Sequence, residues 1–427
     1  MGIDTQDHIM LKYRCLIVAI IILFFNQIAQ AMVYDNRFIP LFKSPRVMMP
    51  NKHSCFTPEL FFATASRSFK DSDSDEEIGL SELYGLYDQG QLARAMDCVG
   101  LPNLLLPEWR RYELRWHMRG KLQAQSFVFS LEKSIVSYCK KFHYFAGINS
   151  LIMQTHGRTE FIFDNQSPNK VFGVGNNQEL DQIRRQMNDL LNLNAGSFRQ
   201  IGFGDFDIYF GARKQWDHLY KFRTFYLDGR LGVLAPTGVN QDWNTVGSIP
   251  FGGNGHWGIY GANKVEIEVK ENLKVGYLFR INKRFARNVK MRLSVKGEPI
   301  LFGVEYGKVR VDPAPTIIFA PYFAAENIRD GFGVHIVYTL RYHGQDSWVD
   351  LRQGSDLVEL DLKQAIKNTA WSSDYFTLKA FYDFGKTKME RSLEPVLYAA
   401  WDIPSAMLAT KRVYKTNRFT VGIQFSF

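Results

Sequence analysis

The last nine residues of the chain, 419–427, alternate between apolar side chains and small or polar ones. The apolar positions are Phe419, Val421, Ile423, Phe425 and Phe427. Because successive side chains of a β-strand point to opposite faces, this segment predicts a strand with one apolar and one polar face. A soluble protein would have to cover the apolar face with a core. A membrane barrel can instead leave it in lipid and turn the polar face to its lumen.

The same period of two recurs along most of the chain. In 256–269, for example, Ile259, Val265 and Ile267 alternate with Lys264 and Glu266. The alternation predicts twelve strands, at 56–66, 118–131, 143–154, 200–213, 222–235, 256–269, 273–283, 314–326, 331–343, 374–384, 392–401 and 413–427. We therefore expect an all-β chain folded as a transmembrane antiparallel β-barrel of about twelve strands. Fourteen is the alternative, because 289–296 and 300–306 could add a hairpin.

The connections between these strands differ in length in a regular way. Single-chain bacterial barrels have an even number of strands, short periplasmic turns and longer external loops. Here the turns after the even-numbered strands are short, and the connection after strand eleven is of middling length. The sequence therefore predicts long external loops at 67–117, 155–199, 236–255, 284–313 and 344–373.

Both ends of the chain carry features of an exported barrel. Near the N-terminus, Lys12 and Arg14 precede an apolar run at 15–25 and a small-x-small cleavage site that ends at Ala31. This pattern predicts a signal peptide at 1–31 and a mature barrel at 32–427, with an uncleaved anchor as the alternative. The Phe-terminated last strand resembles the signal read by the barrel-assembly machinery. These features favour the outer membrane of a two-membrane (Gram-negative type) bacterium.

Composition changes this picture little. After Ala31 no apolar run reaches eighteen residues, which excludes a helical membrane span, and aromatic residues make up 15% of the chain. The mature chain keeps Cys55, Cys98 and Cys139, so at most one disulfide is possible, with Cys98 and Cys139 as the candidate pair. No metal-ligand spacing, cofactor motif or nucleic-acid signature is present. A secreted β-sandwich or solenoid is the soluble alternative.

One loop segment has helical rather than strand periodicity. The spacing of apolar residues in 178–193 predicts an amphipathic helix in the loop between the third and fourth predicted strands. If it lies in or across the barrel mouth, it would act as a plug or gate, with its basic residues near Asp205 and Asp207. Packing on other loops is the alternative. A second, shorter helix is predicted at 80–97. The plug or gate candidates are Leu180, Ile183, Arg184, Arg185, Met187 and Leu190.

Two further loop segments are strongly charged. The segment 71–77 is acidic and resembles the opening of a calcium loop, but it lacks the glycine needed at the sixth position, which favours a solvated loop. The segment 283–296 is basic, and we expect it to meet anionic lipid headgroups at the outer surface. Its basic residues are Lys283, Arg284, Arg287, Lys290, Arg292 and Lys296.

Two glycine-rich runs carry a resemblance to a known family. They are Gly202-Phe203-Gly204-Asp205, which opens a strand, and Leu231-Gly232-Val233-Leu234-Ala235-Pro236-Thr237-Gly238, which ends the next one. These runs, and more loosely the chain to its C-terminus, resemble the outer-membrane transporter-like family associated with the phenol-degradation meta-pathway. That family is related to the long-chain fatty acid transporters. The resemblance implies a channel for small, hydrophobic or amphipathic solutes. The N-terminus departs from it, since the fatty acid transporters' hatch with its short Asn-Pro motif has no clear counterpart, which puts fatty acids as the solute in doubt.

The leading functional hypothesis is therefore a passive, porin-like channel with outer-membrane lipids and a small-molecule solute as partners. An adhesin or other surface structural protein is the second hypothesis. An outer-membrane lipid hydrolase is a third, which is disfavoured because G-x-S-x-G is absent and the strand histidines His256, His335 and His343 are predicted to point inward. The lumen-lining candidates are Asp205, Asp207, Asp228, Arg230, Lys264, Glu266, Glu268, Lys274, Arg280, His335, Thr339, Arg341 and Lys379. Structural ion pairs are the alternative role for each charged residue among them.

Overall fold

The structure is a computed structural model that describes the chain in several stretches. The described residues are 36–39, 43, 45–47, 54–70, 77–84, 86–102, 104–105, 109, 112–135, 142–164, 177–219, 221–296, 298, 302–353, 358–386 and 394–427. The predicted signal peptide, Cys139 and most of the acidic segment 71–77 lie outside these residues.

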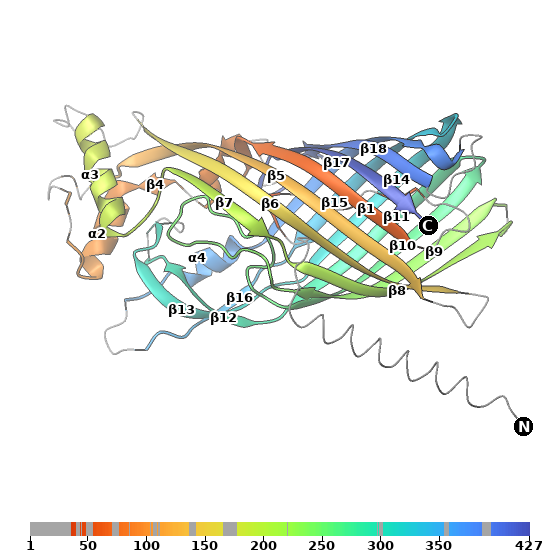
Figure 1. Ribbon diagram of the computed structural model, residues 1–427. Coiled ribbons are helices and arrows are strands. Elements are labelled where there is room, and N and C mark those ends of the chain that lie inside the picture. Colours follow the sequence, from red (N-terminus) through yellow and green to blue (C-terminus); the bar gives the residue numbers. More distant parts are fainter. Residues whose placement is uncertain are drawn as a thin grey trace, which may run out of the picture.

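Within the described residues, twelve antiparallel strands close into a barrel (Figure 1). Each strand pairs with the next one along the chain, and the last pairs with the first, so this described wall has no open edge. The predicted twelve-stranded antiparallel barrel is confirmed. Its strands are β1 (Cys55–Ala65), β5 (Arg115–Ile135), β6 (His143–Phe163), β8 (Phe206–Asp217), β9 (Thr224–Ala235), β10 (Gly258–Lys270), β11 (Leu273–Arg284), β14 (Thr316–Arg329), β15 (Phe332–His343), β17 (Trp371–Asp383), β18 (Glu394–Ser405) and β20 (Asn417–Ser426).

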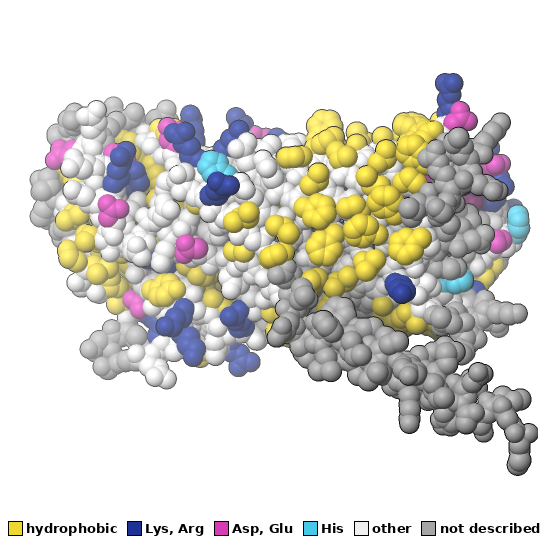
Figure 2. All heavy atoms as spheres, in the orientation of Figure 1, with side chains coloured by type: hydrophobic (Ala, Val, Ile, Leu, Met, Phe, Trp, Pro, Cys, Tyr) yellow, Lys and Arg dark blue, Asp and Glu magenta, His cyan; other side chains and the backbone are white. Residues whose placement is uncertain are grey.

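The alternation in the sequence becomes an apolar outside and a polar inside. On β20, Phe419 and Val421 are exposed, whereas Arg418, Thr420 and Gln424 between and beside them are buried. Figure 2 shows hydrophobic side chains spread over the barrel wall, with charged side chains gathered mainly toward the two ends. Large apolar side chains exposed on other strands include Leu60, Phe62, Phe127, Ile208, Phe210, Leu231, Ile259, Ile336, Leu378 and Trp401. This arrangement suits a wall surrounded by lipid.

Two of the short turns show why the hairpins form where they do. Asp330 and Gly331, between β14 and β15, both have positive φ, 45° and 94°. A two-residue turn with two positive φ angles matches the twist of the strands it joins, and Asp-Gly is a favoured pair for it. Between β10 and β11, Asn272 also has positive φ, at 63°. Local turn chemistry therefore sets the register of both hairpins.

Strand boundaries differ from the prediction at one informative point. The segment predicted as one strand at 200–213 is divided into two strands. β7 (Ser197–Phe203) pairs with residues 152–158 of β6, and β8 pairs with residues 143–149 of β6. The break falls at Gly204 and Asp205. The strands β5 and β6 also run beyond their predicted ends, so part of the predicted loop at 155–199 is strand.

A hairpin forms near the segments that suggested fourteen strands, with its second strand later than predicted, and it lies outside the barrel. Strands β12 (Arg287–Leu293) and β13 (Glu305–Asp312) form a separate three-stranded sheet with β16 (Ser347–Asp350). Their inner face buries Met291, Leu293, Val309 and Val311 in a cluster of its own. The fourteen-stranded alternative is therefore wrong, because this hairpin covers its apolar side chains with protein.

The long connections gather at one end of the barrel and form a cap (Figure 1). The cap contains β12, β13 and β16, the strands β4 (Tyr87–Asp88) and β7, and the helices α2 (Gln89–Cys98), α3 (Asn177–Leu190) and α4 (Leu362–Lys367). Smaller elements are β2 (Arg67–Phe69), β3 (Glu77–Gly79), β19 (Val413–Tyr414), and the 3-10 helices η1 (Leu80–Tyr84) and η4 (Phe384–Lys386). The helix predicted at 178–193 is confirmed as α3, and the one at 80–97 is divided into η1, β4 and α2.

Among the described residues, no helix is both long and apolar enough to cross a membrane.

Candidate functional site: the barrel lumen

A segment from the N-terminal part of the chain lies inside the barrel. Its described residues are 36–39, 43 and 45–47, and we call them the luminal segment. Inward-facing side chains from several parts of the wall bind its backbone. Arg341 donates to Asn36 O at 2.8 Å, and Thr416 donates to Phe38 O at 2.6 Å. Lys379 donates to Pro45 O and Gln424 donates to Val47 O, both at 2.9 Å. The segment therefore occupies space that would otherwise belong to a lumen.

Two basic side chains of this segment reach the wall on the opposite side. Lys43 donates to the amide oxygen of Asn149 on β6, and Arg46 forms an ion pair with Glu132 on β5 at 3.2 Å. The segment carries prolines and no regular period, so nothing in its residue pattern indicates a strand or a helix. This luminal position was not predicted, and it supplies an internal N-terminal element where none was expected.

Glu132 is the centre of a buried charge network. Its carboxylate pairs with Arg46, with Arg213 from β8 and, at 3.4 Å, with Arg230 from β9. Arg230 also makes a two-pronged contact with Asp228, with both nitrogen–oxygen distances at 2.7 Å. Three guanidinium groups therefore share two carboxylates in this part of the lumen. Such a network is stable inside a protein only because its charges are paired.

A second network lies farther around the wall, on β10, β11 and β14. Glu266 lies 2.7 Å from Lys264 and 3.4 Å from Lys274, and Lys274 lies 2.7 Å from Glu326. His335 reaches Glu326 at 3.5 Å. These groups neutralise one another, so this region is a structural ladder of alternating charges.

Two aspartates lie on either side of the start of β8, and they hold different parts of the structure. Asp207 pairs with Arg280 at 3.1 Å and accepts from Asn149. Asp205, at the strand break, pairs with Arg284 at 2.5 Å and accepts backbone N–H groups of the 236–255 loop. The guanidinium of Arg280 also lies 3.4 Å from the ring centre of Tyr260. The strand break therefore lets Asp205 leave the barrel ladder and anchor a loop.

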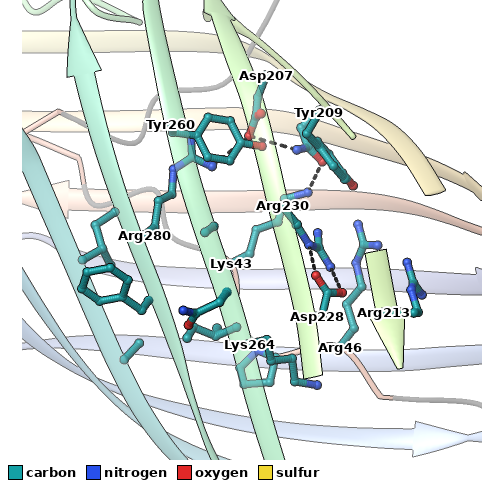
Figure 3. A pocket seen from close by; sticks show the side chains of 18 of the residues that line it. Lys43, Arg46, Asp207, Tyr209, Arg213, Asp228, Arg230, Tyr260, Lys264 and Arg280 are labelled. Atoms are coloured by element: carbon teal, nitrogen blue, oxygen red, sulfur yellow. Dashed lines mark hydrogen bonds and ion pairs between the residues drawn. The ribbon is translucent and has the colours of Figure 1, made fainter. Parts of the chain in front are cut away.

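Between the luminal segment and the β8–β11 wall lies a cavity of about 140 Å³ (Figure 3). Its charged lining consists of Lys43, Arg46, Glu132, Asp207, Arg213, Asp228, Arg230, Lys264 and Arg280. Its less polar lining includes Pro45, Tyr209, Tyr226, Tyr260, Ala262, Leu278, Phe279, Ile318 and Ala320. The cavity therefore combines basic groups, phenol rings and aliphatic side chains in one small space.

Most of the residues singled out from the sequence fall into four places. Asp207, Asp228, Arg230, Lys264 and Arg280 line the cavity, and Glu266, Lys274 and His335 belong to the charge ladder. Asp205 anchors the loop, and Arg341 and Lys379 hold the luminal segment. Thr339 is fully buried, and Glu268 is half-buried with bonds to Thr224 and Asn272. His256, His335 and His343 are all buried.

Sequence reasoning missed several residues of the site. Glu132 lies one residue beyond the predicted strand 118–131, and Arg213 is the last residue of the predicted strand 200–213. The period of two points both side chains inward, because Arg213 is in phase with Asp207 and Glu132 is reached by extending its strand by one residue. Tyr209 was missed because an inward tyrosine carries no charge signal. Lys43 and Arg46 had no periodic pattern to place them.

The helix α3 packs in the cap and does not lie in the barrel lumen. Leu180 and Met187 are fully buried in an apolar cluster of the cap, which also contains Leu92, Met96 and Trp116. Ile183 packs against the same cluster, and Leu190 is largely exposed. Figure 1 shows α3 beside α2 at the far end of the cap. The cap packing left open as an alternative is the one observed.

The expected pairing of the α3 arginines with Asp205 and Asp207 is also wrong. Arg184 and Arg185 both pair with Asp181 on their own helix, at 2.6 and 2.7 Å. Arg184 additionally lies 4.0 Å from the ring centre of Phe161 on β6. Short-range partners at helical spacing satisfy both guanidinium groups within the cap.

The basic segment 283–296 divides into buried and exposed residues. Arg284 pairs with Asp205, and Arg292 donates to loop carbonyls including Gly303 O at 3.1 Å. Both side chains are buried, so the expected contact with lipid headgroups is wrong for these two. Lys283 instead pairs with Asp312 at 2.9 Å. Arg287, Lys290 and Lys296 are exposed.

The cap also holds a buried carboxyl group. Glu298 accepts backbone N–H groups of Val295 and Val304, each at 2.8 Å, and has little exposure. Burial raises the pKa of Glu298 from 4.5 to about 8. The cap therefore contains a group that can bind a proton near neutral pH. Among the described residues no cluster of potential ligands suits a metal ion.

Comparison with known proteins bears on the fold. No family model and no curated protein matches the sequence. An outer membrane channel from Pseudomonas putida F1 aligns over 89% of this chain and 97% of its own, at 10% identity and a TM-score of 0.51. A FadL homologue from Pseudomonas aeruginosa aligns over 88% of this chain and 90% of its own, at 10% identity and a TM-score of 0.33.

The toluene transporter TodX from Pseudomonas putida aligns over 88% of this chain and 90% of its own, at 7% identity and a TM-score of 0.35. Similarity at these two lower TM-scores is too weak to support a conclusion. The likeness to the channel from Pseudomonas putida F1 concerns the fold alone. This chain has the transmembrane barrel fold of that outer membrane channel, as the resemblance carried by its two glycine-rich runs implied.

Proposed function

We propose that this protein is an outer-membrane channel through which small amphipathic solutes pass passively along the barrel lumen. The observation that carries the proposal is the cavity of about 140 Å³ inside a closed barrel whose outer wall is apolar. A barrel of this kind exposes its apolar residues to lipid and its polar residues to the path of a solute. The predicted signal peptide and the last strand support export to the outer membrane of a two-membrane bacterium.

In this proposal the wall contributes a mixed-sign lining. Rings of charged side chains set which solutes enter a pore, and the lumen candidates that line the cavity include both acids and bases. Asp207, Asp228 and Arg230 belong to this lining. Lys264, which pairs with Glu266, also lines the cavity, whereas Glu266 and Lys274 stabilise the wall outside it.

The luminal segment is the closed gate of the channel. It is held by separate hydrogen bonds from Arg341, Lys379 and Gln424, and by contacts of its own Lys43 and Arg46 with the wall, rather than by strand pairing. A typical hydrogen bond contributes about 0.5 to 1.5 kcal/mol net, so local release of the segment costs far less than opening the barrel wall. We infer that solutes cross when the segment moves aside.

Single-channel conductance in planar bilayers tests this function. The mature chain should show small or intermittent conductance, and a variant lacking 32–47 should conduct continuously. Removal of 177–190, which takes away a cap helix outside the lumen, is the matched control and should leave conductance as in the parent. If the variant lacking 32–47 folds and does not conduct, the channel proposal fails. The adhesin hypothesis would then gain support, since the cap has apolar clusters of its own.

A further inference from the structure

We propose that the luminal cavity binds a small organic carboxylate with an apolar body of about one aromatic ring. This inference rests on the proposed channel function and names the class of solute that the lumen selects. It follows from three properties of the cavity: its charge balance, its size and its apolar lining.

The charge balance of the lining favours an anion. Lys264 is matched by Glu266, at 2.7 Å. The remaining basic side chains, Lys43, Arg46, Arg213, Arg230 and Arg280, face the carboxylates Glu132, Asp207 and Asp228. The four guanidinium groups among them already outnumber the three carboxylates, and Lys43 adds a further basic group. In a confined space of low dielectric constant, an excess of positive charge attracts a negatively charged ligand and repels a cation.

The basic groups also converge from different elements. Lys43 and Arg46 belong to the luminal segment, whereas Arg213, Arg230 and Arg280 project from β8, β9 and β11 (Figure 3). The Nε group of Arg213 is buried and has no hydrogen-bond partner among the described residues. A buried donor without an acceptor is unfavourable. A carboxylate is the acceptor that a guanidinium binds best, through two parallel hydrogen bonds.

The size of the cavity limits the ligand to about one ring. A cavity of about 150 Å³ in another protein holds one benzene molecule, and this cavity has a volume of about 140 Å³. A simple inorganic anion would leave most of that space unfilled. A two-ring body would require the wall or the luminal segment to move.

The rest of the lining suits an apolar body. The side chains of Leu278, Ile318 and Ala320 form aliphatic surface, and the rings of Tyr226 and Tyr260 add flat surface. Aromatic rings pack against one another in stacked or edge-to-face arrangements. A ligand with a carboxylate at one end and a ring at the other would satisfy both halves of the lining. Benzoate is the simplest probe with this chemistry.

Isothermal titration calorimetry on the folded mature chain in detergent tests the inference. Benzoate should bind at least about tenfold more tightly than benzyl alcohol, which lacks the charge-assisted hydrogen bonds. It should also bind more tightly than acetate, which lacks the ring, and than 2-naphthoate, which is too large. Benzyl alcohol or benzylamine binding as tightly as benzoate would overturn the proposal. Acetate binding as tightly would overturn the role given to the apolar lining.

Variants of the luminal segment test the site without altering a barrel strand. Arg46→Gln should weaken benzoate binding by about tenfold, the range for losing one charge-assisted contact, while Glu132 keeps Arg213 and Arg230 as partners. Arg37→Gln is the matched control, because Arg37 lies on the same segment, donates to Asn368 O and does not line the cavity. Heat-modifiable gel migration checks that both variants fold. Equal benzoate affinity in Arg46→Gln and the parent would contradict the site.

The outcome for this inference is separable from that for the channel function. Conductance is measured on the same preparations without any aromatic ligand. A conducting protein that does not bind benzoate would overturn the solute class and leave the channel standing. A protein that binds benzoate and never conducts, with or without residues 32–47, would overturn the channel and leave the binding site standing.

Discussion

Replacement of Asp205 by alanine should destabilise the barrel far more than loss of an ordinary ion pair. Asp205 is fully buried at the break between β7 and β8, and its partner Arg284 is almost fully buried as well. The pair is 2.5 Å apart, and Asp205 also accepts the backbone N–H groups of Gly238 and Gly253. One side chain therefore ties together a barrel strand, the end of β11 and the 236–255 loop.

The magnitude follows from what the substitution leaves behind. Asp205→Ala leaves the Arg284 guanidinium buried without this carboxylate, while its hydrogen bond to His256 O, at 2.8 Å, remains. Removing one partner of a buried pair costs about 3 to 5 kcal/mol. The exposed pair of Arg223 and Glu271, 2.9 Å apart, provides the control. Glu271→Ala should cost about 0 to 1 kcal/mol, because water already solvates both groups.

Urea-induced unfolding of the refolded protein in lipid vesicles, followed by tryptophan fluorescence, measures both values. The double variant Asp205→Ala, Arg284→Leu should be less destabilised than the sum of the single variants, since it removes both charges of the buried pair. Equal free energies of unfolding for Asp205→Ala and Glu271→Ala would refute the buried anchor. So would strict additivity in the double variant.

Three further predictions concern assembly, the cap and pH. Deleting Phe427, whose side chain is half-exposed, should sharply lower the amount of barrel in the outer membrane. The stability of the refolded barrel should change by at most about 2 to 3 kcal/mol. Phe427→Tyr should assemble normally, and normal levels of the deletion variant would count against an assembly signal. Removing α3 should expose the cap to protease without raising solute uptake, and increased uptake would mean that α3 restricts the lumen after all. Because burial raises the pKa of Glu298 from 4.5 to about 8, the folded cap holds a proton that the unfolded cap releases, so cap stability should fall as pH rises from about 4.5 to 8. Limited proteolysis at pH 5 and pH 8.5 should detect this fall in the parent and not in Glu298→Gln, and a parent that resists protease equally at both pH values would contradict it.

The barrel was predictable because each strand repeats the same simple contrast between lipid and lumen. The alternation of Phe419 and Val421 with Thr420 needs no knowledge of a neighbouring strand. The hairpin β12–β13 shows the limit of this signal. A strand that packs its apolar face on Trp243 or Trp348 has the same period of two as a strand that faces lipid. Periodicity identifies a two-faced strand but not what covers the apolar face.

The amphipathic helix α3 illustrates the same limit. Its stripe of Leu180 and Met187 predicts burial correctly, yet the sequence does not say which surface it meets. In the structure that surface is the part of β5 and β6 that extends past the barrel, together with α2. The extension was missed, so the barrel mouth was the nearest place where the helix could bury its stripe.

The site itself depends on contacts that no local pattern encodes. Inward-facing charges could be recognised from strand phase, as for Asp228 and Arg230. Their partners could not, because Glu132 on β5 meets Arg230 on β9 across the lumen. The position of the luminal segment could not be predicted for a different reason. An irregular backbone held by single hydrogen bonds leaves no periodic pattern of apolar residues in the sequence. Its position is determined by the wall residues that bind it.

The most direct test of the central claim is to fix the luminal segment in place and release it again. Gln424 donates to the backbone oxygen of Val47 at 2.9 Å, so these two positions lie side by side. The variant Val47→Cys, Gln424→Cys is made in a background that carries Cys55→Ser, Cys98→Ser and Cys139→Ser. A short thiol reagent that dithiothreitol cleaves then links the two new thiols. Single-channel conductance should be absent in the linked protein and should return on reduction, while the unlinked background protein should not respond to dithiothreitol. Equal conductance of the linked and reduced forms would show that solutes do not need the segment to move, and would contradict the role of the luminal segment as the gate.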